Sequence, residues 1–191
     1  MAGRQSLQDF QARLARRLAD PGAEAPTADW LGIAWRGVHA LLPLAQAGEV
    51  FTPTALQPVP HTQAWVTGVA ALRGGLCLVL DWVALLGLAA GTAGQGADDD
   101  EAAVHWVSLN PVAGVPAALC ADRLLGLRNR ADFQPEPGLN TAVGSDPDTA
   151  DAIRVWSDRA GQRWHEIDLL RLARSPAFLN PYRPGHSARA A

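Results

Sequence analysis

VTGVAALRGGLCLVLDWVALLGL, residues 66–88, is the stretch of this chain that decides its fold. VTGVAALRGG and LCLVLD are aliphatic segments with glycine breaks, a pattern that predicts two β-strands. The following WVALLGL predicts a short helix that Asp81 caps and Gly87 ends. The spacing between strands does not leave room for the long crossover helices of a doubly wound α/β sheet. We therefore expect a mainly β protein.

A predicted hairpin precedes this stretch. From Trp30 onward, large apolar residues alternate with small ones, and Arg36-Gly37 makes a turn before VHALLPL returns as a second strand. Glu49 is expected at the end of that second strand, within AQAGEVF. A proline-rich connection, residues 52–62, then leads into the next strands.

The second half of the chain repeats this order of elements. AVHWVSLN turns through PVAG and returns as VPAALCADRLLGL, and IRVWSD with QRWHEID predicts a later hairpin. Asp168 then caps a leucine-rich helix that Pro176 is expected to stop. Because both halves end in an Asp-capped helix after several strands, we expect two similar β-subdomains. A Gly- and Ala-rich stretch with an acidic run reads as a flexible loop between them.

The amino-terminal residues predict an amphipathic helix. Within residues 6–19, Leu7, Phe10, Leu14 and Leu18 are spaced by three and four, while the arginines point elsewhere. The turn-rich residues 20–29 make this helix separable from the body. Its apolar stripe could cover the protein's own core, or it could dock on the body or on a partner.

The charge of the chain excludes several classes of function. Its 191 residues carry 16 basic and 19 acidic side chains, a net charge of −3, which disfavours nucleic acid as a partner. All of the basic residues are arginines, so the chain has no Schiff-base lysine and no GxxxxGK[ST] phosphate loop. We found no signal-peptide pattern and no apolar stretch long enough to span a membrane. We therefore expect a cytoplasmic protein with no direct membrane insertion.

The sequence also lacks recognisable motifs for catalysis, metal binding or cofactor binding. Cys77 and Cys120 lie in apolar runs, which predicts reduced core residues rather than zinc ligands. The five histidines are scattered without ligand spacing, and the glycine-rich residues 91–96 run into an acidic cluster that would repel phosphate. We expect no catalytic residue, no metal site and no cofactor.

Arg73 is the residue for which the sequence most clearly demands a partner. It is a single charge inside an apolar segment, and Glu49 is the only other charge between Arg36 and Arg73. An Arg73–Glu49 ion pair is therefore predicted, either at a functional surface or as an ordinary exposed pair. Four neighbouring aliphatic residues are candidates for an apolar surface near the subdomain junction, or alternatively for the core. They are Val66, Val69, Leu72 and Leu76.

These segments resemble the CheW family of chemotaxis adaptors over about residues 30–175. The resemblance rests on the hairpin ending in a glutamate, the GVAALRGG segment, the LVLDWVALLGL strand and helix, and the later AVHWVSLN and GVPAALCADRLLGLRN. Arg73, Gly74, Glu49 and Asp81 match the family pattern, whereas Ala71 replaces its asparagine. The amino-terminal helix, tryptophan-rich body and carboxyl-terminal region resemble most the CheW-like adaptors of type IV pilus chemosensory systems.

The resemblance implies a non-enzymatic protein built from two small five-stranded β-barrels that share a core. It implies an adaptor that joins a CheA-type histidine kinase, through the kinase's regulatory domain, to the cytoplasmic tip of a methyl-accepting chemoreceptor. The expected output is twitching motility, with flagellar chemotaxis or another kinase output as the alternative. A partner-binding surface is implied around Arg73, Glu49 and Gly74, with Val69 and Leu72 beside them. A small β-barrel enzyme or ligand-binding protein is the alternative from another class.

The expected organisation has three parts. Residues 1–29 are the amino-terminal helix and linker, residues 30–180 the CheW-like domain, and residues 181–191 a tail. Within the domain, we expect a first subdomain at about 30–88, a loop at 89–101 and a second subdomain at about 102–175.

Overall fold

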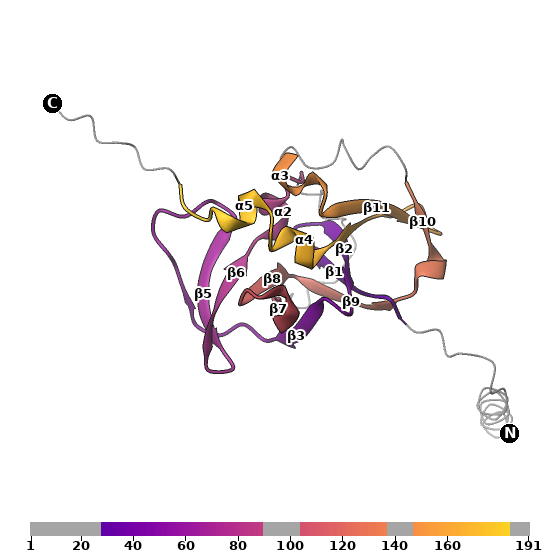
Figure 1. Cartoon of the computed structure of the whole chain (residues 1–191). Helices are drawn as coiled ribbons and strands as arrows, with labels where there is room; N and C mark the ends of the chain where they lie inside the picture. Colours follow the sequence, from indigo (N-terminus) through magenta and orange to yellow (C-terminus); the bar gives the residue numbers. More distant parts are fainter. Residues whose placement is uncertain (1–27, 90–103, 137–146, 184–191) are drawn as a thin grey trace, which may run out of the picture.

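The computed structural model describes residues 28–89, 104–136 and 147–183. The predicted amino-terminal helix and most of the predicted loop at 89–101 lie outside these residues. The described chain is mainly β, as predicted, with its strands in two six-stranded sheets (Figure 1).

The first sheet, which we call the tryptophan sheet, has the strand order β10-β11-β12-β2-β1-β9. Its strands are β1 (Trp30–Trp35), β2 (Val38–Pro43), β9 (Arg123–Arg128), β10 (Phe133–Pro135), β11 (Ile153–Asp158) and β12 (Arg163–Ile167). All of its strand pairs are antiparallel except β2 with β12, which run parallel.

The second sheet, which we call the cysteine sheet, has the order β3-β7-β8-β6-β5-β4. Its strands are β3 (Ala47–Phe51), β4 (Leu56–Gln57), β5 (Val66–Leu72), β6 (Gly75–Leu80), β7 (His105–Leu109) and β8 (Ala117–Ala121). Its parallel pair is β6 with β8. Each sheet thus contains one parallel seam between two otherwise antiparallel groups of strands.

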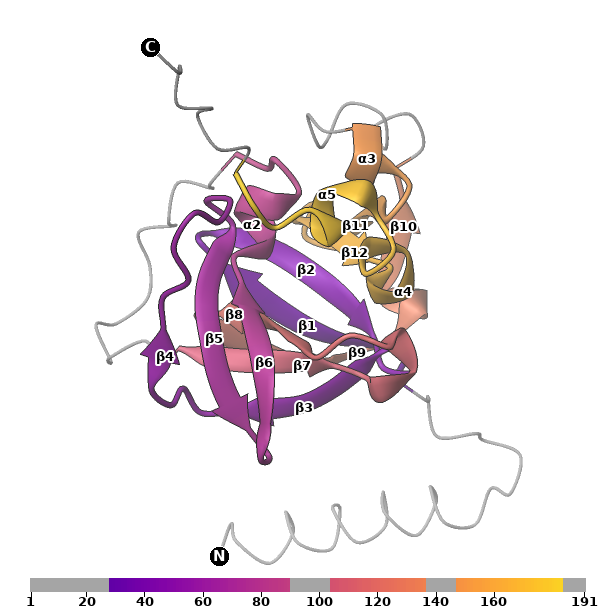
Figure 2. The same ribbon diagram turned by 60° about the vertical axis from the view of Figure 1, so that its left-hand side comes forward.

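Four short α-helices lie along the same side of the molecule in Figures 1 and 2. They are α2 (Trp82–Leu85), α3 (Pro147–Ala150), α4 (Leu169–Leu172) and α5 (Pro176–Leu179), and the described chain also contains the 3₁₀ turns η1 (Pro111–Ala113) and η2 (Arg130–Asp132). The predicted caps are confirmed, because the side chains of Asp81 and Asp168 accept hydrogen bonds from the first turns of α2 and α4. Pro176 differs from the prediction: α4 already ends at Leu172, and the proline is the first residue of α5.

Each sheet curls around an apolar interior to which all six of its strands contribute. The interior of the tryptophan sheet consists of Trp30, Leu41, Leu125, Phe133, Trp156 and Trp164. The interior of the cysteine sheet includes Phe51, Leu56, Ala70, Leu72, Cys77, Val79, Trp106, Ala118 and Cys120. The barrel-like shape therefore agrees with the expectation, but two details were wrong. Each sheet has six strands rather than five, and its two edge strands are not hydrogen-bonded to close a barrel.

A third and larger cluster lies between the sheets and forms the predicted shared core. Its fully buried members come from both sheets and from the helices, and include Ile33, Leu42, Leu80, Trp82, Leu86, Leu119, Ile167, Leu169 and Leu172. At ~25 cal/mol per Å² of buried apolar surface, burial of this kind is the main stabilising contribution to the fold. The two sheets are therefore one cooperative body rather than two independent units.

The sheets do not coincide with the two halves of the sequence, which corrects the expected assignment of each half to its own barrel. The apolar segment VPAALCADRLLGL, expected as one strand, contains β8 in one sheet and β9 in the other. The change of sheet takes place at Asp122, whose N–H donates to the Ala34 carbonyl while its carboxylate accepts from the Arg36 N–H. These bonds to the β1–β2 hairpin redirect the chain.

Candidate functional site

Arg73 lies at the tip of the β5–β6 hairpin rather than inside an apolar core. Leu72 and Gly75 are the last paired residues, so Arg73 and Gly74 form a two-residue turn. Both have positive φ, 48° and 79°, as the type I′ turn requires. Glycine adopts this conformation readily, whereas an arginine in it is uncommon. The turn projects the guanidinium away from the sheet, with 72% of the side chain exposed.

Glu49 lies on β3, a separate strand of the cysteine sheet, which corrects its expected place at the end of the β1–β2 hairpin. Its backbone is held at a break in the β3–β7 register, where the Ser108 hydroxyl accepts from the Glu49 N–H at 2.9 Å. Gly48 allows this close approach, because a Cβ there would collide with Ser108 Oγ and lie 2.9 Å from the Leu109 carbonyl. Ser108 and Gly48 therefore set the direction of the Glu49 side chain.

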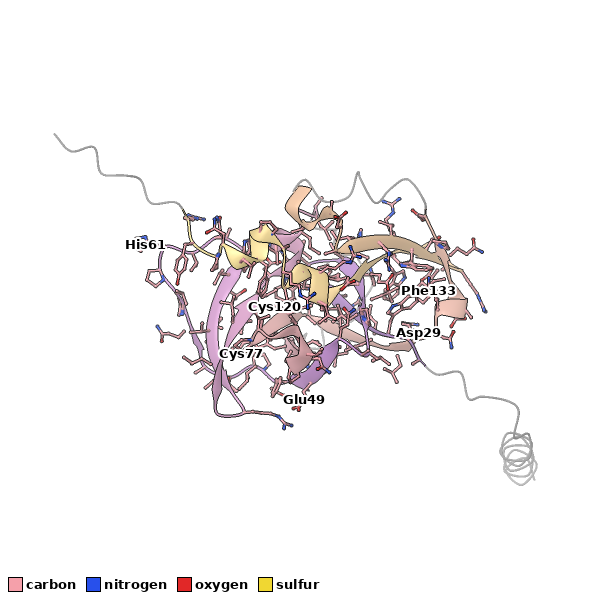
Figure 3. The ribbon with its side chains drawn as sticks, in the orientation of Figure 1. Asp29, Glu49, His61, Cys77, Cys120 and Phe133 are labelled. Atoms are coloured by element: carbon pink, nitrogen blue, oxygen red, sulfur yellow. The ribbon has the colours of Figure 1, made fainter. Side chains whose placement is uncertain are left out.

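The predicted ion pair between Arg73 and Glu49 is present. β3 and the β5–β6 hairpin are not hydrogen-bonded neighbours, and the pair connects them because the cysteine sheet curls. Figure 3 shows Glu49 at the end of the molecule that carries the tip of the β5–β6 hairpin. Since the carboxylate is 48% exposed, solvent screens the pair, and it contributes at most ~1 kcal/mol to stability.

The four aliphatic candidates near this pair divide between surface and core. Val66 is buried, Val69 and Leu72 are half-buried, and Leu76 is 71% exposed. Val50, which the sequence analysis did not single out, is also exposed next to Glu49. We define the hairpin site as Glu49, Val50, Arg73, Gly74 and Leu76. Single exposed aliphatic residues are common, but here one directly follows Glu49 on β3 and the other lies three residues after Arg73 on β6.

The two cysteines lie beneath this surface and were correctly predicted as buried, free thiols. Burial raises the pKa of Cys77, and it raises the pKa of Cys120 to about 11. A thiol with a raised pKa is a poor nucleophile and a poor metal ligand at neutral pH. Among the described residues, no group of three or more His, Cys, Asp or Glu side chains is arranged to hold a metal ion.

The tryptophan sheet contains a polar network that sequence reasoning missed. The buried Glu166 carboxylate accepts hydrogen bonds from the indole N–H groups of Trp30, at 3.2 Å, and Trp156, at 2.9 Å. The guanidinium carbon of Arg130 lies 4.7 Å from the centre of the Trp156 ring. Tryptophan spacing alone could not reveal the Trp30–Glu166 contact, because it joins residues that are 136 positions apart in sequence. The network fixes the interior of the sheet, which gives it a structural role.

A shallow cavity of about 280 Å³ lies beside this network. It is lined by Ala131, Asp132, Phe133, Gln134, Asp158, Arg159 and Gly161. Arg159 and Asp132 form an ion pair of 2.9 Å in its wall, and the Asp158 carboxylate accepts hydrogen bonds from the Trp164 indole and from two backbone N–H groups, so its charged groups already have partners. No helix within the described segments is long and apolar enough to cross a bilayer.

Comparisons with known proteins agree with this architecture. A family model described as a CheW-like domain matches residues 30–176. Protein PilI of Pseudomonas aeruginosa is 33% identical over 86 residues, which are 44% of this chain and 48% of PilI. The match thus spans about half of that protein's length. The crystal structure of the scaffolding protein TtCheW from Thermoanaerobacter tengcongensis has a TM-score of 0.52 at 16% identity, and the match covers 73% of this chain and 88% of that one. At this identity, the structural match shows a shared fold.

Proposed function

Because this chain belongs to the CheW-like domain family, we propose that it is a non-enzymatic adaptor that couples a CheA-type histidine kinase to a chemoreceptor. The kinase would be bound through its regulatory domain, and the receptor through its cytoplasmic tip. The family assignment favours this function over the alternative of a small β-barrel enzyme or ligand-binding protein. A cytoplasmic location is part of the same proposal.

The hairpin site is the observation that supports an adaptor surface here. Its ion pair joins two elements of one sheet at the surface, and exposed Val50 and Leu76 lie beside it. Protein interfaces commonly combine apolar contacts with arginine, and a few such residues carry most of the binding energy. Because the pair adds little to stability, its replacement can weaken binding without unfolding the protein. Arg73, Glu49 and Gly74, with half-buried Val69 and Leu72 as support, are therefore the proposed partner-binding residues.

The similarity to PilI supports type IV pilus twitching motility as the output of the pathway. An adaptor of flagellar chemotaxis or of another kinase pathway would have the same fold. Affinity capture of the tagged chain from its native host distinguishes these outputs by the kinase and receptor that co-purify. Capture of a flagellar kinase in place of a pilus kinase would reject the twitching assignment and keep the adaptor.

Binding measurements on purified partners test the hairpin site itself. We expect Arg73→Ala to weaken binding to the kinase regulatory domain or the receptor tip about 30-fold, which corresponds to ~2 kcal/mol. The exchange of both charges, Arg73→Glu with Glu49→Arg, should restore part of this loss. Arg159→Ala is the matched control, because it breaks an equally exposed pair on the other sheet and should leave binding unchanged. Normal binding of both partners by Arg73→Ala, with an unchanged melting temperature, would remove the hairpin site from the proposal.

A further inference from the structure

The outer edge of β9 is the longest strand edge in the described part of the chain. β9 has six residues without proline and pairs with β1 on its inner side. The other three edges are shorter: β10 has three residues and ends in a proline, β4 has two residues, and β3 has five with a break in register. Native proteins blunt exposed edges by these same means. β9 has one bulge, beside Gly126, but it is neither short nor interrupted by a proline, so a covering segment would protect it from pairing with another chain.

The β9 edge also presents two exposed leucines, Leu124 at 40% and Leu127 at 65%. The strand bulges before Gly126, which has a φ of 80°, so that Leu124 pairs with Ile33 and Leu127 with Leu31. Residues two apart on a strand share a face. The bulge therefore brings both leucines to one face, the same face as Ile33, which belongs to the shared core. They form an apolar rim that continues the core to the surface.

The chain enters the fold directly beside this rim. The Asp29 N–H donates to the Arg128 carbonyl at 2.9 Å, and the Asp29 carboxylate accepts from the Arg130 N–H at 2.7 Å. Asp29 is thereby fixed at the carboxyl end of β9, as its position in Figure 3 also shows. The chain is therefore anchored at the carboxyl end of β9, one residue beyond Leu127, at the point where the described residues begin.

The sequence of the segment that precedes the described chain fits the rim in length and in chemistry. A helix over residues 6–19 would be about 21 Å long, and a six-residue strand is about 20 Å long. Residues 20–27 form a connection that reaches at most about 29 Å, enough for the segment to fold back along β9. The apolar stripe of this helix would pack against the two exposed leucines of β9. The stripe consists of Leu7, Phe10, Leu14 and Leu18.

We propose that residues 6–19 fold back as an amphipathic helix onto Leu124 and Leu127 and cover the edge of β9 in the same molecule. Arg13 and Arg16 lie off the apolar stripe and would face solvent, whereas Arg17 lies at the edge of the stripe beside Phe10. The guanidinium of Arg128 is already directed inward, 5.3 Å from the centre of the Trp164 ring. A partner that uses the β9 edge would have to displace the helix, so the segment acts as an internal competitor for this surface. The inference does not depend on the adaptor function.

Trypsin cleavage of the full chain tests the docking directly, because the segment contains its own cleavage sites at Arg13, Arg16 and Arg17. Cleavage of a docked helix requires that it open first, so the rate follows the population of the open form. We expect the double variant Leu124→Ser with Leu127→Ser to be cleaved in this segment roughly tenfold faster than the wild type. Phe10→Asp, which spoils the apolar stripe, should reach a similar rate. Leu179→Ser is the matched control, since Leu179 is equally exposed on α5 and should not change the rate.

Three outcomes would overturn the proposal. Wild-type cleavage as fast as that of Phe10→Asp would mean that the helix is not docked. Unchanged cleavage in the β9 double variant, with a normal thermal melt, would mean that the helix does not dock on Leu124 and Leu127. The rim would then be free to bind another protein. Protection that grows with protein concentration would assign the rim to the helix of a second copy.

Discussion

His165 should make the stability of this protein depend steeply on pH. It lies on β12 opposite Ala40, in the parallel seam that joins β12 to β2, and it is 7% exposed. Its Nδ1 is buried without a hydrogen-bond partner. Burial, and to a lesser degree the nearby Arg163, lowers the pKa of His165 to about 4, whereas Glu136 opposes this shift. A charged imidazole is disfavoured in this position because burial removes it from water.

The expected loss of stability follows from the difference between folded and unfolded states. An unfolded histidine has a pKa of about 6.5, so below this pH the unfolded chain binds a proton that the folded chain does not. Stability is therefore complete above pH 6.5, falls as the pH decreases, and reaches its full loss below pH 4. With the folded pKa at about 4, the loss is about 2 kcal/mol at pH 5 and about 3 kcal/mol below pH 4.

Urea denaturation at pH 7 and pH 5 measures this effect. His165→Phe keeps a ring of similar size and cannot titrate, so the variant should lack about 2 kcal/mol of the wild type's acid-induced loss. The difference should persist in 0.5 M NaCl, because burial rather than a surface charge is its main cause. Burial also lowers the pKa of His39, and His39→Gln should remove a further part of the loss. Equal pH dependence in wild type and His165→Phe would refute the reasoning.

Three other substitutions or treatments have definite expected outcomes. Asp81→Ala should lower the free energy of unfolding by about 2 kcal/mol or more, since it removes the cap of α2 and two side-chain hydrogen bonds, and a chemical melt checks this. Gly48→Ala should cost about 1–3 kcal/mol, because the added methyl group meets Ser108 and the backbone, and a melt no lower than that of the wild type would contradict the packing. Cys77 and Cys120 should react with a thiol reagent slowly in the native protein and readily in denaturant, whereas fast native labelling of both would contradict their burial.

Local features of this fold could be predicted from the sequence, and non-local ones could not. The caps at Asp81 and Asp168 and the turn at Arg36-Gly37 depend on neighbouring residues, and each is present as expected. The exchange of strands between sheets depends on contacts across the chain. Nothing in the apolar segment around Asp122 signals a break there, because the bonds that turn the chain come from Ala34 and Arg36.

The candidate site was predictable to the same extent. Two lone charges in an apolar region predicted the pair of Arg73 and Glu49, and the pair is formed. The sequence could not place Leu76, because an aliphatic residue next to a turn suits either the core or the surface. Val50 was missed for a related reason, since a break in register at β3 changes which residues face outward. Exposure in both cases is decided by strand register, which the alternation of residues alone does not determine.

In the two Arg-Gly turns of this protein, exposure of the acidic partner, rather than local sequence, separates a pair committed to the fold from a candidate binding site. Arg36 and Arg73 both have positive φ in two-residue turns, and each pairs with a carboxylate. The partner of Arg36 is Asp81, 14% exposed, which also caps α2 and accepts from the Trp35 indole, so that pair is committed to the fold. Glu49 is about half exposed, and among the described residues its carboxylate contacts Arg73 alone. A binding partner could therefore engage the Glu49 carboxylate without disturbing any other polar contact of the fold, whereas a partner that drew Asp81 away from Arg36 would also disturb the cap of α2.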